Sequence, residues 1–240
     1  MWMKDFIRKI RIGWMHAHAP FCWELKLSSS KILIVAPHPD DECMGTGGLV
    51  RRLVCLGYAP HVLFMTQGEG SHGACCDLDA SSIKEARKKL AMHVAKVLEL
   101  PDDHLHWMDF PDGGIGQSVS KDNLLEGLMG ELSPQIVFVP HWGEGWPDHV
   151  NAAKIVKSLV HKNATVYEYC VWLWYYNVWH LDWKNACVLR MTREEHEMKC
   201  RCVDMYVTPL APCGKPWSGV LPAMLVDAAK WKNEFFFKCK

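Results

Sequence analysis

Short apolar runs rich in β-branched residues alternate with longer segments of helical spacing, and this alternation constrains the fold more than any other feature of the sequence. The pattern predicts buried strands at 31–37, 61–66, 135–140 and 164–174, with a weaker strand at 105–110. A segment of helical spacing lies between each strand and the next. Such alternation is typical of an α/β fold, in which a mainly parallel sheet carries helices on both faces.

The length of 240 residues suits one domain of this kind, because a single core usually serves about 100–250 residues. We therefore expect a single domain over 1–240, with an N-terminal extension at 1–30 and a helical C-terminal extension at about 180–240. The N-terminal extension mixes Trp, Phe, Ile, Lys and Arg, which suits packing against the domain or lying on a membrane surface. A Pro-rich connection at 208–216 divides the C-terminal extension.

The net charge and the cysteine content limit which partners the protein can have and which cellular compartment it suits. Basic and acidic residues number 27 each, so the chain has no net charge that would attract nucleic acid. The 11 cysteines are odd in number and lack the regular spacing of a disulfide framework, which favours a reducing compartment. No apolar run approaches the roughly 20 residues of a membrane span. The sequence therefore predicts a cytoplasmic protein without nucleic-acid partners and without a membrane span.

Polar loops follow two of the predicted strands directly, at 36–42 and 141–149. Ligands of open parallel sheets bind at the carboxyl ends of the strands, so the two loops are expected to meet at one edge. His38 and Asp41 are three residues apart on a tight turn and can face one point, where His149 can supply a third ligand. Two imidazoles and one carboxylate leave zinc an open position for water, as in hydrolytic sites.

Asp40 lies between these ligands in sequence and points elsewhere, so it is free to take a proton from metal-activated water as general base. A second interpretation makes Asp40 and Asp41 the N-cap and a first-turn acid of the helix that follows. That interpretation explains the acids but gives no reason for His38.

The first loop carries ProHisProAspAspGlu at 37–42, and the second carries TrpProAspHis at 146–149. On these motifs the sequence resembles the LmbE/PIG-L-like N-acetylglucosaminyl deacetylases, whose hallmarks are (A/P)-H-P-D-D-E and H-P-D-H. Further agreement within 31–175 covers GlyThrGlyGly at 45–48, GlyGlu at 68–69, PheProAspGly at 110–113 and ValTyrGluTyr at 166–169. The resemblance implies a Rossmann-like α/β fold and zinc-dependent removal of an acetyl group from an N-acetylated amino sugar.

The resemblance also implies roles for single residues in the two motifs. His38, Asp41 and His149 match the metal ligands of the family, and Asp40 matches its general base. Asp148, next to the last ligand, is expected to orient the site.

Two further residues match positions at which family members contact the substrate. Arg87 corresponds to an arginine of the helix before the third strand, although the usual glutamate partner is replaced by Leu90. Asp112 falls where the family contacts the sugar, and an aspartate before glycine is also a common turn residue.

Trp146 is the main departure from the family pattern, because it replaces the histidine that stabilises the oxyanion. An indole N–H is a neutral donor and cannot shuttle a proton. His141, on the same loop, is expected to take over this catalytic role, with His72 in the glycine-rich loop as a second candidate.

The sequence thus predicts a metal-dependent hydrolase that removes the acetyl group from an N-acetylated amino sugar or sugar conjugate. Its cofactor is zinc or another divalent ion, its partner is a small-molecule sugar conjugate, and an oligomer is compatible with the sequence. The alternative is a catalytically impaired protein that keeps the metal pocket and binds the conjugate. The aromatic run at 171–176 then either lines the sugar cleft or packs in the core.

Overall fold

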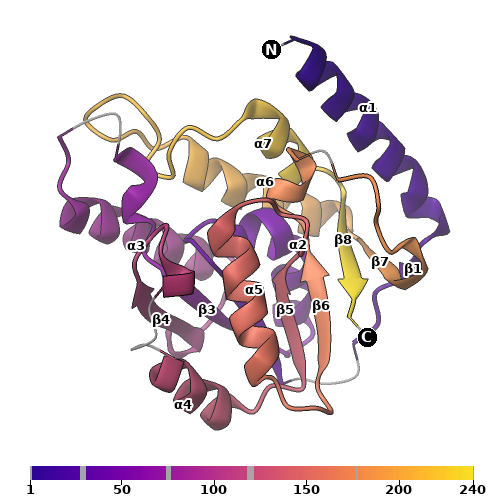
Figure 1. The fold of residues 1–240 in the computed structure, drawn as a ribbon, viewed down its shortest axis with the longest axis horizontal. Helices are drawn as coiled ribbons and strands as arrows, with labels where there is room; N and C mark the ends of the chain where they lie inside the picture. The colour runs from indigo at the N-terminus through magenta and orange to yellow at the C-terminus, as the bar shows by residue number, and fades with distance from the viewer. Residues whose placement is uncertain (1, 28–30, 74–76, 118–121, 177, 240) are drawn as a thin grey trace.

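A computed structural model describes residues 2–27, 31–73, 77–117, 122–176 and 178–239. The strands are β1 (Trp23–Glu24), β2 (Ile32–Ala36), β3 (His61–Thr66), β4 (Leu105–Phe110), β5 (Ile136–Pro140), β6 (Thr165–Tyr169), β7 (Ala186–Arg190) and β8 (Asn233–Lys238). The α-helices are α1 (Trp2–His18), α2 (Asp41–Cys55), α3 (Ala80–Val97), α4 (Asp122–Leu132), α5 (Pro147–Leu159), α6 (Arg193–Val207) and α7 (Ala223–Ala229). The strands form one sheet in the order β1-β7-β8-β6-β5-β2-β3-β4 (Figure 1).

The five strands predicted from the sequence form a continuous parallel block of this sheet. β6, β5, β2, β3 and β4 lie side by side and run in the same direction. Every residue of β2 and β5 is buried, because helices cover both faces of the sheet at these central strands. The predicted α/β class is therefore confirmed, and the adjacent carboxyl ends of β2 and β5 are the two points at which the polar loops begin.

The helices form two layers around the sheet. Ile32 and Ile34 of β2 face a core that includes residues of α2, α3, α6 and α7. Leu33 and Val35 face the opposite core, to which α4 and α5 contribute. Successive side chains of a strand point to opposite faces, so each strand supplies both cores at once.

The C-terminal third contains the expected helices, α6 and α7, and in addition two strands that the sequence analysis did not predict. β8 lies between β6 and β7 and is antiparallel to both. Its Phe236 packs into one core, while Phe235 and Phe237 pack on the other side of the sheet. Because the three aromatic residues are buried on both faces, the run shows no alternation of apolar and polar residues.

Helix α1 packs on the sheet with its C-terminal half and leaves its N-terminal half exposed. Met15 is fully buried against β7 and β8, whereas Met3 and Phe6 are 70% and 53% exposed. In Figure 1 the helix runs along the upper right of the molecule, with the N-terminus at its outer end. Among the described residues, no helix is both long and apolar enough to cross a membrane.

Strands from Trp23 to Lys238 share this one sheet, so the N-terminal and C-terminal extensions pack on the same body as the central strands. The division into one domain with two extensions stays a prediction.

Candidate metal centre

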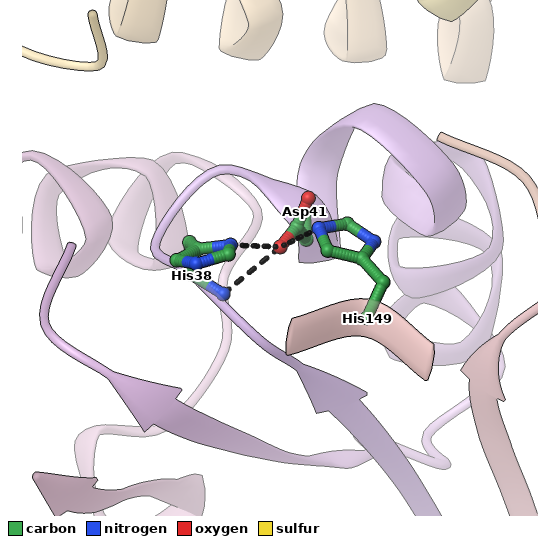
Figure 2. A group of neighbouring side chains, drawn as sticks. All are labelled: His38, Asp41 and His149. Carbon is green, nitrogen blue, oxygen red and sulfur yellow. Dashed lines mark hydrogen bonds and ion pairs between the residues drawn. The ribbon is translucent and has the colours of Figure 1, made fainter. Parts of the chain in front are cut away.

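The turn after β2 brings His38 and Asp41 together. The backbone N–H of His38 donates to Asp41 Oδ2 at 2.9 Å, which closes the turn over Pro39 and Asp40. Asp40 has a φ of 136°, a conformation that costs free energy for a residue with a side chain and that marks functional turns. Across the sheet edge, α5 begins at Pro147 and places His149 on its first turn. Figure 2 shows the three side chains converging from these two elements.

Three ligand atoms surround one point. Asp41 Oδ2 lies 3.3 Å from His38 Nδ1 and 3.2 Å from His149 Nε2. Within the described chain, both ring nitrogens of the buried His149 lack a hydrogen bond of acceptable geometry, although carboxylate oxygens lie close to them. Buried imidazole nitrogens that face carboxylates without such bonds fit a cation between them. The three residues predicted as ligands are therefore brought together, in an arrangement that suits zinc.

The outer nitrogen of each ligand histidine also meets a carboxylate. His38 Nε2 lies 3.0 Å from Asp112 Oδ1 and 3.4 Å from Asp148 Oδ2. His149 Nδ1 lies 3.1 Å from Glu144 Oε2. Carboxylates in this position fix the tautomer and orientation of metal-binding histidines and raise their basicity.

Asp112 and Asp148 hold their places through backbone hydrogen bonds. Asp112 Oδ2 accepts from the N–H of Gly70 at 2.8 Å, and Asp148 Oδ2 accepts from the N–H of Gly113 at 2.7 Å. Together with His38 they form a second group whose ligand atoms lie within 4.8 Å of one another. Because both carboxylates already accept backbone N–H groups and share only one histidine, we interpret the group as orienting carboxylates rather than as a second metal site.

Sequence reasoning missed Glu144, which is fully buried beneath the site. Its carboxylate accepts the backbone N–H groups of Val171, Trp172 and Leu173 at 2.8, 2.6 and 3.1 Å. Glu144 thus links His149 to the segment after β6. Its only sequence signal is a charged residue between two glycines in the loop after β5.

Asp40 faces the same cavity from the other side of the turn. Its Oδ2 accepts from Arg87 Nη2 at 3.0 Å, and the same nitrogen donates to the carbonyl of Pro39 at 2.6 Å. Burial raises the pKa of Asp40 to about 7, with Asp41 adding to the rise and Arg87 opposing it. A carboxylate whose pKa lies near neutrality suits a general base. The structure brings Arg87 to the site, where its guanidinium holds this carboxylate.

Glu42, the third acid of the motif, holds the backbone of Asp40 through a hydrogen bond. Its Oε2 accepts from the backbone N–H of Asp40 at 2.9 Å, and Tyr206 of α6 donates its hydroxyl proton to the other oxygen. Burial raises the pKa of Glu42 to about 8. These contacts tie the strained turn to the C-terminal helices.

The two ligand histidines lie in a strongly negative environment. Burial lowers the pKa of His149, but Asp41 and Glu144 overcome that effect and raise it to about 9. Burial likewise lowers the pKa of His38, and Asp112, Asp148 and Asp41 raise it well above its ordinary value. A cluster that stabilises positive charge this strongly also favours a divalent cation.

A cavity of about 430 Å³ is lined by two of the three predicted ligands, His38 and Asp41. Its charged and titratable lining residues are His38, Asp40, Asp41, Arg87 and Asp112, and its other lining residues include Ser71, Trp146, Trp172 and the segment 218–221. The Trp146 ring stacks on that of Trp172, with centroids 5.1 Å apart and planes inclined by 15°. The residue that departs from the family motif is therefore part of an aromatic wall of the cavity.

The expectation that His141 reaches the cavity is not met. His141 is buried and, among the described residues, is absent from the cavity lining. Its Nδ1 accepts from the N–H of Gly143 at 2.9 Å, so the ring proton lies on Nε2, 3.5 Å from Glu168. Burial lowers its pKa to about 3, and Lys157 adds to the effect.

The second candidate, His72, also lies outside the lining. It is buried, with Nδ1 3.6 Å from the Sγ of Cys213 and its ring 5.9 Å from that of Trp217.

The glycines at 45–48 allow α2 to approach the sheet and the C-terminal segment closely. A Cβ atom at Gly45 would lie 2.2 Å from the Tyr169 ring, and one at Gly48 would lie 2.1 Å from Met191. The Tyr169 hydroxyl donates to the carbonyl of Val35 at 2.7 Å. These contacts hold the start of α2, and with it Asp41, against the end of β2.

Comparison with known proteins places this geometry in a family. A family model described as PIG-L, GlcNAc-PI de-N-acetylase, matches residues 33–160. A 1D-myo-inositol 2-acetamido-2-deoxy-alpha-D-glucopyranoside deacetylase from Rhodococcus opacus is 28% identical over 166 residues, covering 58% of this chain and 56% of that protein. A diacetylchitobiose deacetylase from Thermococcus kodakarensis is 29% identical over 125 residues, covering 51% of this chain and 46% of that protein. The chain thus spans about half the length of these curated relatives.

The fold agrees with a solved structure as well. The N,N'-diacetylchitobiose deacetylase of Pyrococcus horikoshii matches with a TM-score of 0.60 and 18% identity, over 72% of this chain and 68% of that one. The matched family segment contains both loops and all three candidate ligands. The chain belongs to the PIG-L family.

Proposed function

We propose that this protein is a metal-dependent hydrolase that removes the acetyl group from an N-acetylated amino sugar or sugar conjugate. One observation carries the proposal: His38, Asp41 and His149 surround one point, and Asp40 faces the same cavity without belonging to that group. A three-ligand site with a separate carboxylate is the arrangement of metal-assisted hydrolysis.

In the proposed reaction His38 Nδ1, Asp41 Oδ2 and His149 Nε2 hold the divalent ion. When bound, the ion supplies Lewis acidity toward water and the acetyl carbonyl. Asp40 takes the proton of the attacking water and returns it to the leaving amine, and Arg87 holds its carboxylate in place through the 3.0 Å contact.

Other residues of the cavity position the sugar. The wall formed by Trp146 and Trp172 offers an aromatic surface for the apolar face of the ring. Asp112 also lines the cavity, so besides facing His38 it can accept a hydrogen bond from a sugar hydroxyl, in keeping with its expected role in substrate binding.

We also propose that the metal is zinc, that the substrate is an N-acetylated amino sugar, and that the protein is cytoplasmic. Two imidazoles and one carboxylate suit zinc, and relatives are named for acetamido-sugar and diacetylchitobiose substrates. The nine cysteines in the described part of the chain are all free thiols, which supports a cytoplasmic location.

The test is release of free amine and acetate from a panel of N-acetylglucosamine conjugates by protein loaded with zinc. We expect turnover by the wild type and little by Asp40→Asn. The alternative is a sugar-binding protein of low activity, and one observation favours it: of the described histidines, only His38 lines the cavity. Binding of the conjugates without acetate release from any of them would establish that alternative.

A further inference from the structure

A second cavity, of about 590 Å³, lies between α1 and α7. Its lining includes Ile12 of α1, Tyr175, Met224 of α7 and Trp231. Its size falls within the range of roughly 300–1,000 Å³ that is usual for small-molecule sites. None of the residues proposed above for metal binding or catalysis lines it.

This second cavity adjoins the metal cavity along two short stretches of chain. Trp172 lines the metal cavity and Tyr175 lines the second, and their rings meet edge to face at a centroid distance of 5.9 Å. On the other side Leu221 lines the metal cavity, while the next residue, Pro222, lines the second. The two cavities are therefore neighbours, and a ligand long enough to extend past the residues between them would reach the second cavity.

Helix α1 contacts the partition between the two cavities, which consists of the segment 172–175 and the residues Leu221 and Pro222. Arg8 Nε donates to the carbonyl of Tyr175 at 2.8 Å, and its guanidinium lies 3.6 Å from the centre of the Tyr175 ring. Arg8 also pairs with Asp5 at 2.8 Å. The Arg8 guanidinium thus already contacts Tyr175 and Asp5, and it is poorly placed to bind an anionic ligand.

The chemistry of the second cavity selects for an apolar group. Six of its twelve lining residues are apolar, including Ile12, Met224, Ala228 and Trp231, and Tyr175 adds a further aromatic ring. Its charged side chains are two acids and two bases, so it carries no net charge toward a ligand; they are Asp5, Arg8, Lys9 and Asp227. Burial of apolar ligand surface is the favourable contribution that such a site offers.

We propose that this second cavity binds the aglycone of the substrate, and that the aglycone is an uncharged apolar group, alkyl or aryl. The inference rests on the proposed deacetylase function, because the metal cavity is taken to hold the acetylated sugar. The protein then acts on amphipathic N-acetylglucosaminides in preference to small polar ones.

The experiment compares methyl, butyl and octyl glycosides of N-acetylglucosamine below their micelle-forming concentrations. We expect kcat/KM to rise by about 10-fold or more from methyl to octyl, because each buried methylene adds to binding. Calorimetric titration with the deacetylated methyl and octyl glucosaminides measures the same preference without turnover. An octyl-to-methyl ratio within about twofold in both measurements would overturn the proposal.

Two matched variants locate the effect. Ala223 is exposed and lines the second cavity, so Ala223→Trp fills it and is expected to lower the octyl-to-methyl ratio toward one. Ala17 is exposed on α1 outside the cavity, so Ala17→Trp keeps the ratio of the wild type. An unchanged ratio in Ala223→Trp would show that the preference arises elsewhere and would contradict the proposal.

The two proposals fail separately. Hydrolysis of all glycosides at one rate, with equal binding, refutes the aglycone site and leaves the deacetylase function standing. Tighter binding of octyl glucosaminide that is lost in Ala223→Trp, without acetate release from any glycoside, supports the aglycone site and refutes the deacetylase function.

Discussion

Asp40 and Asp41 are neighbours on one turn, yet their carboxylates have different surroundings. Asp41 Oδ2 faces the imidazoles of His38 and His149, and these contacts hold the pKa of Asp41 below its ordinary value against the effect of burial. Asp40 faces the guanidinium of Arg87 and the open cavity. Substitutions at the two positions should therefore separate metal binding from proton transfer.

Asp40→Asn is expected to keep the bound metal and to lower turnover by about 10²-fold or more, the usual scale for loss of a general base. Metal content by elemental analysis and acetate release measured on the same preparation check both parts. Asp103→Asn, at an exposed position on the protein surface, serves as the matched control and should change neither. Loss of metal from Asp40→Asn would make Asp40 a ligand.

One divalent ion per chain is expected in protein purified without added metal, and His149→Ala should lose it. Glu144→Gln removes the charge behind His149 and should weaken metal binding by about 10–100-fold. Titration against a competing chelator measures both affinities. His106→Ala, a histidine of β4 outside the site, should bind as the wild type does. Full metal occupancy in His149→Ala would refute the ligand set.

Trp146→His is expected to speed up deacetylation, because the structure places Trp146 on the cavity wall and leaves His141 outside it. Donors to an oxyanion contribute about 10²–10³ in turnover, so a gain of about 10-fold or more is expected even from an imperfectly placed imidazole. Trp146→Phe keeps an aromatic ring and should show no such gain. A slower Trp146→His enzyme would mean that stacking on Trp172 matters more than the added donor.

Sequence reasoning predicted that His38, Asp41 and His149 come together, because they follow strands whose carboxyl ends meet at one sheet edge, and the structure brings them together; their role as metal ligands stays a prediction. It could not find Glu144, whose partners include backbone N–H groups of residues 171–173 that carry no mark in the sequence. It also placed His141 at the cavity because loop position alone does not show which way a side chain points. Hydrogen bonding to Gly143 decides that direction.

At the scale of elements, His141 joins three strands and is kept neutral by burial. It follows β5, its Nε2 faces Glu168 of β6 at 3.5 Å, and its ring packs on Phe237 of β8 at 4.8 Å. Its pKa is about 3 in the folded protein and about 6.5 when unfolded. The unfolded state therefore binds the proton first, and the stabilisation is present above pH 6.5 and lost as the pH falls toward 3.

His141→Gln should remove this part of the pH dependence. Between pH 6.5 and 5.5 the wild type is expected to lose about 1 kcal/mol more stability than His141→Gln, a difference of about 2–4 °C in Tm. Thermal denaturation of both proteins across this range tests the difference. Parallel curves would mean that His141 titrates normally in the folded state. Turnover at pH 7.5 should change by no more than a few-fold, because the residue lies outside the cavity.

The order of elements was predictable where each strand is followed by a helix of clear period. β7 and β8 were not predicted from the sequence. In β8 the reason is that Phe235, Phe236 and Phe237 are buried on both faces, so the strand lacks a two-residue period of apolar and polar residues. Its antiparallel pairing with β6 and β7 also departs from the strand-helix rhythm.

For the whole molecule, metal binding should stabilise the fold, because the ligands come from two separate strand-helix units. At a free zinc concentration about 100 times the Kd, linkage adds about 2.7 kcal/mol, which corresponds to roughly 5–10 °C in Tm for a chain of this size. Calorimetric scans with zinc and with a chelator measure the shift. His149→Ala should show almost none, and an equal shift in that variant would place the stabilising ion elsewhere.

The position of β8 has a consequence for synthesis. It follows β6 and β7 in the sequence, and it lies between these two strands in the sheet. Until Lys238 has left the ribosome, β6 keeps an open edge and β7 is not linked to β6. An unpaired edge of this kind invites pairing with other chains. The nascent protein is therefore open to aggregation through these edges until β8 has been made, although the other strands of the sheet are complete by then.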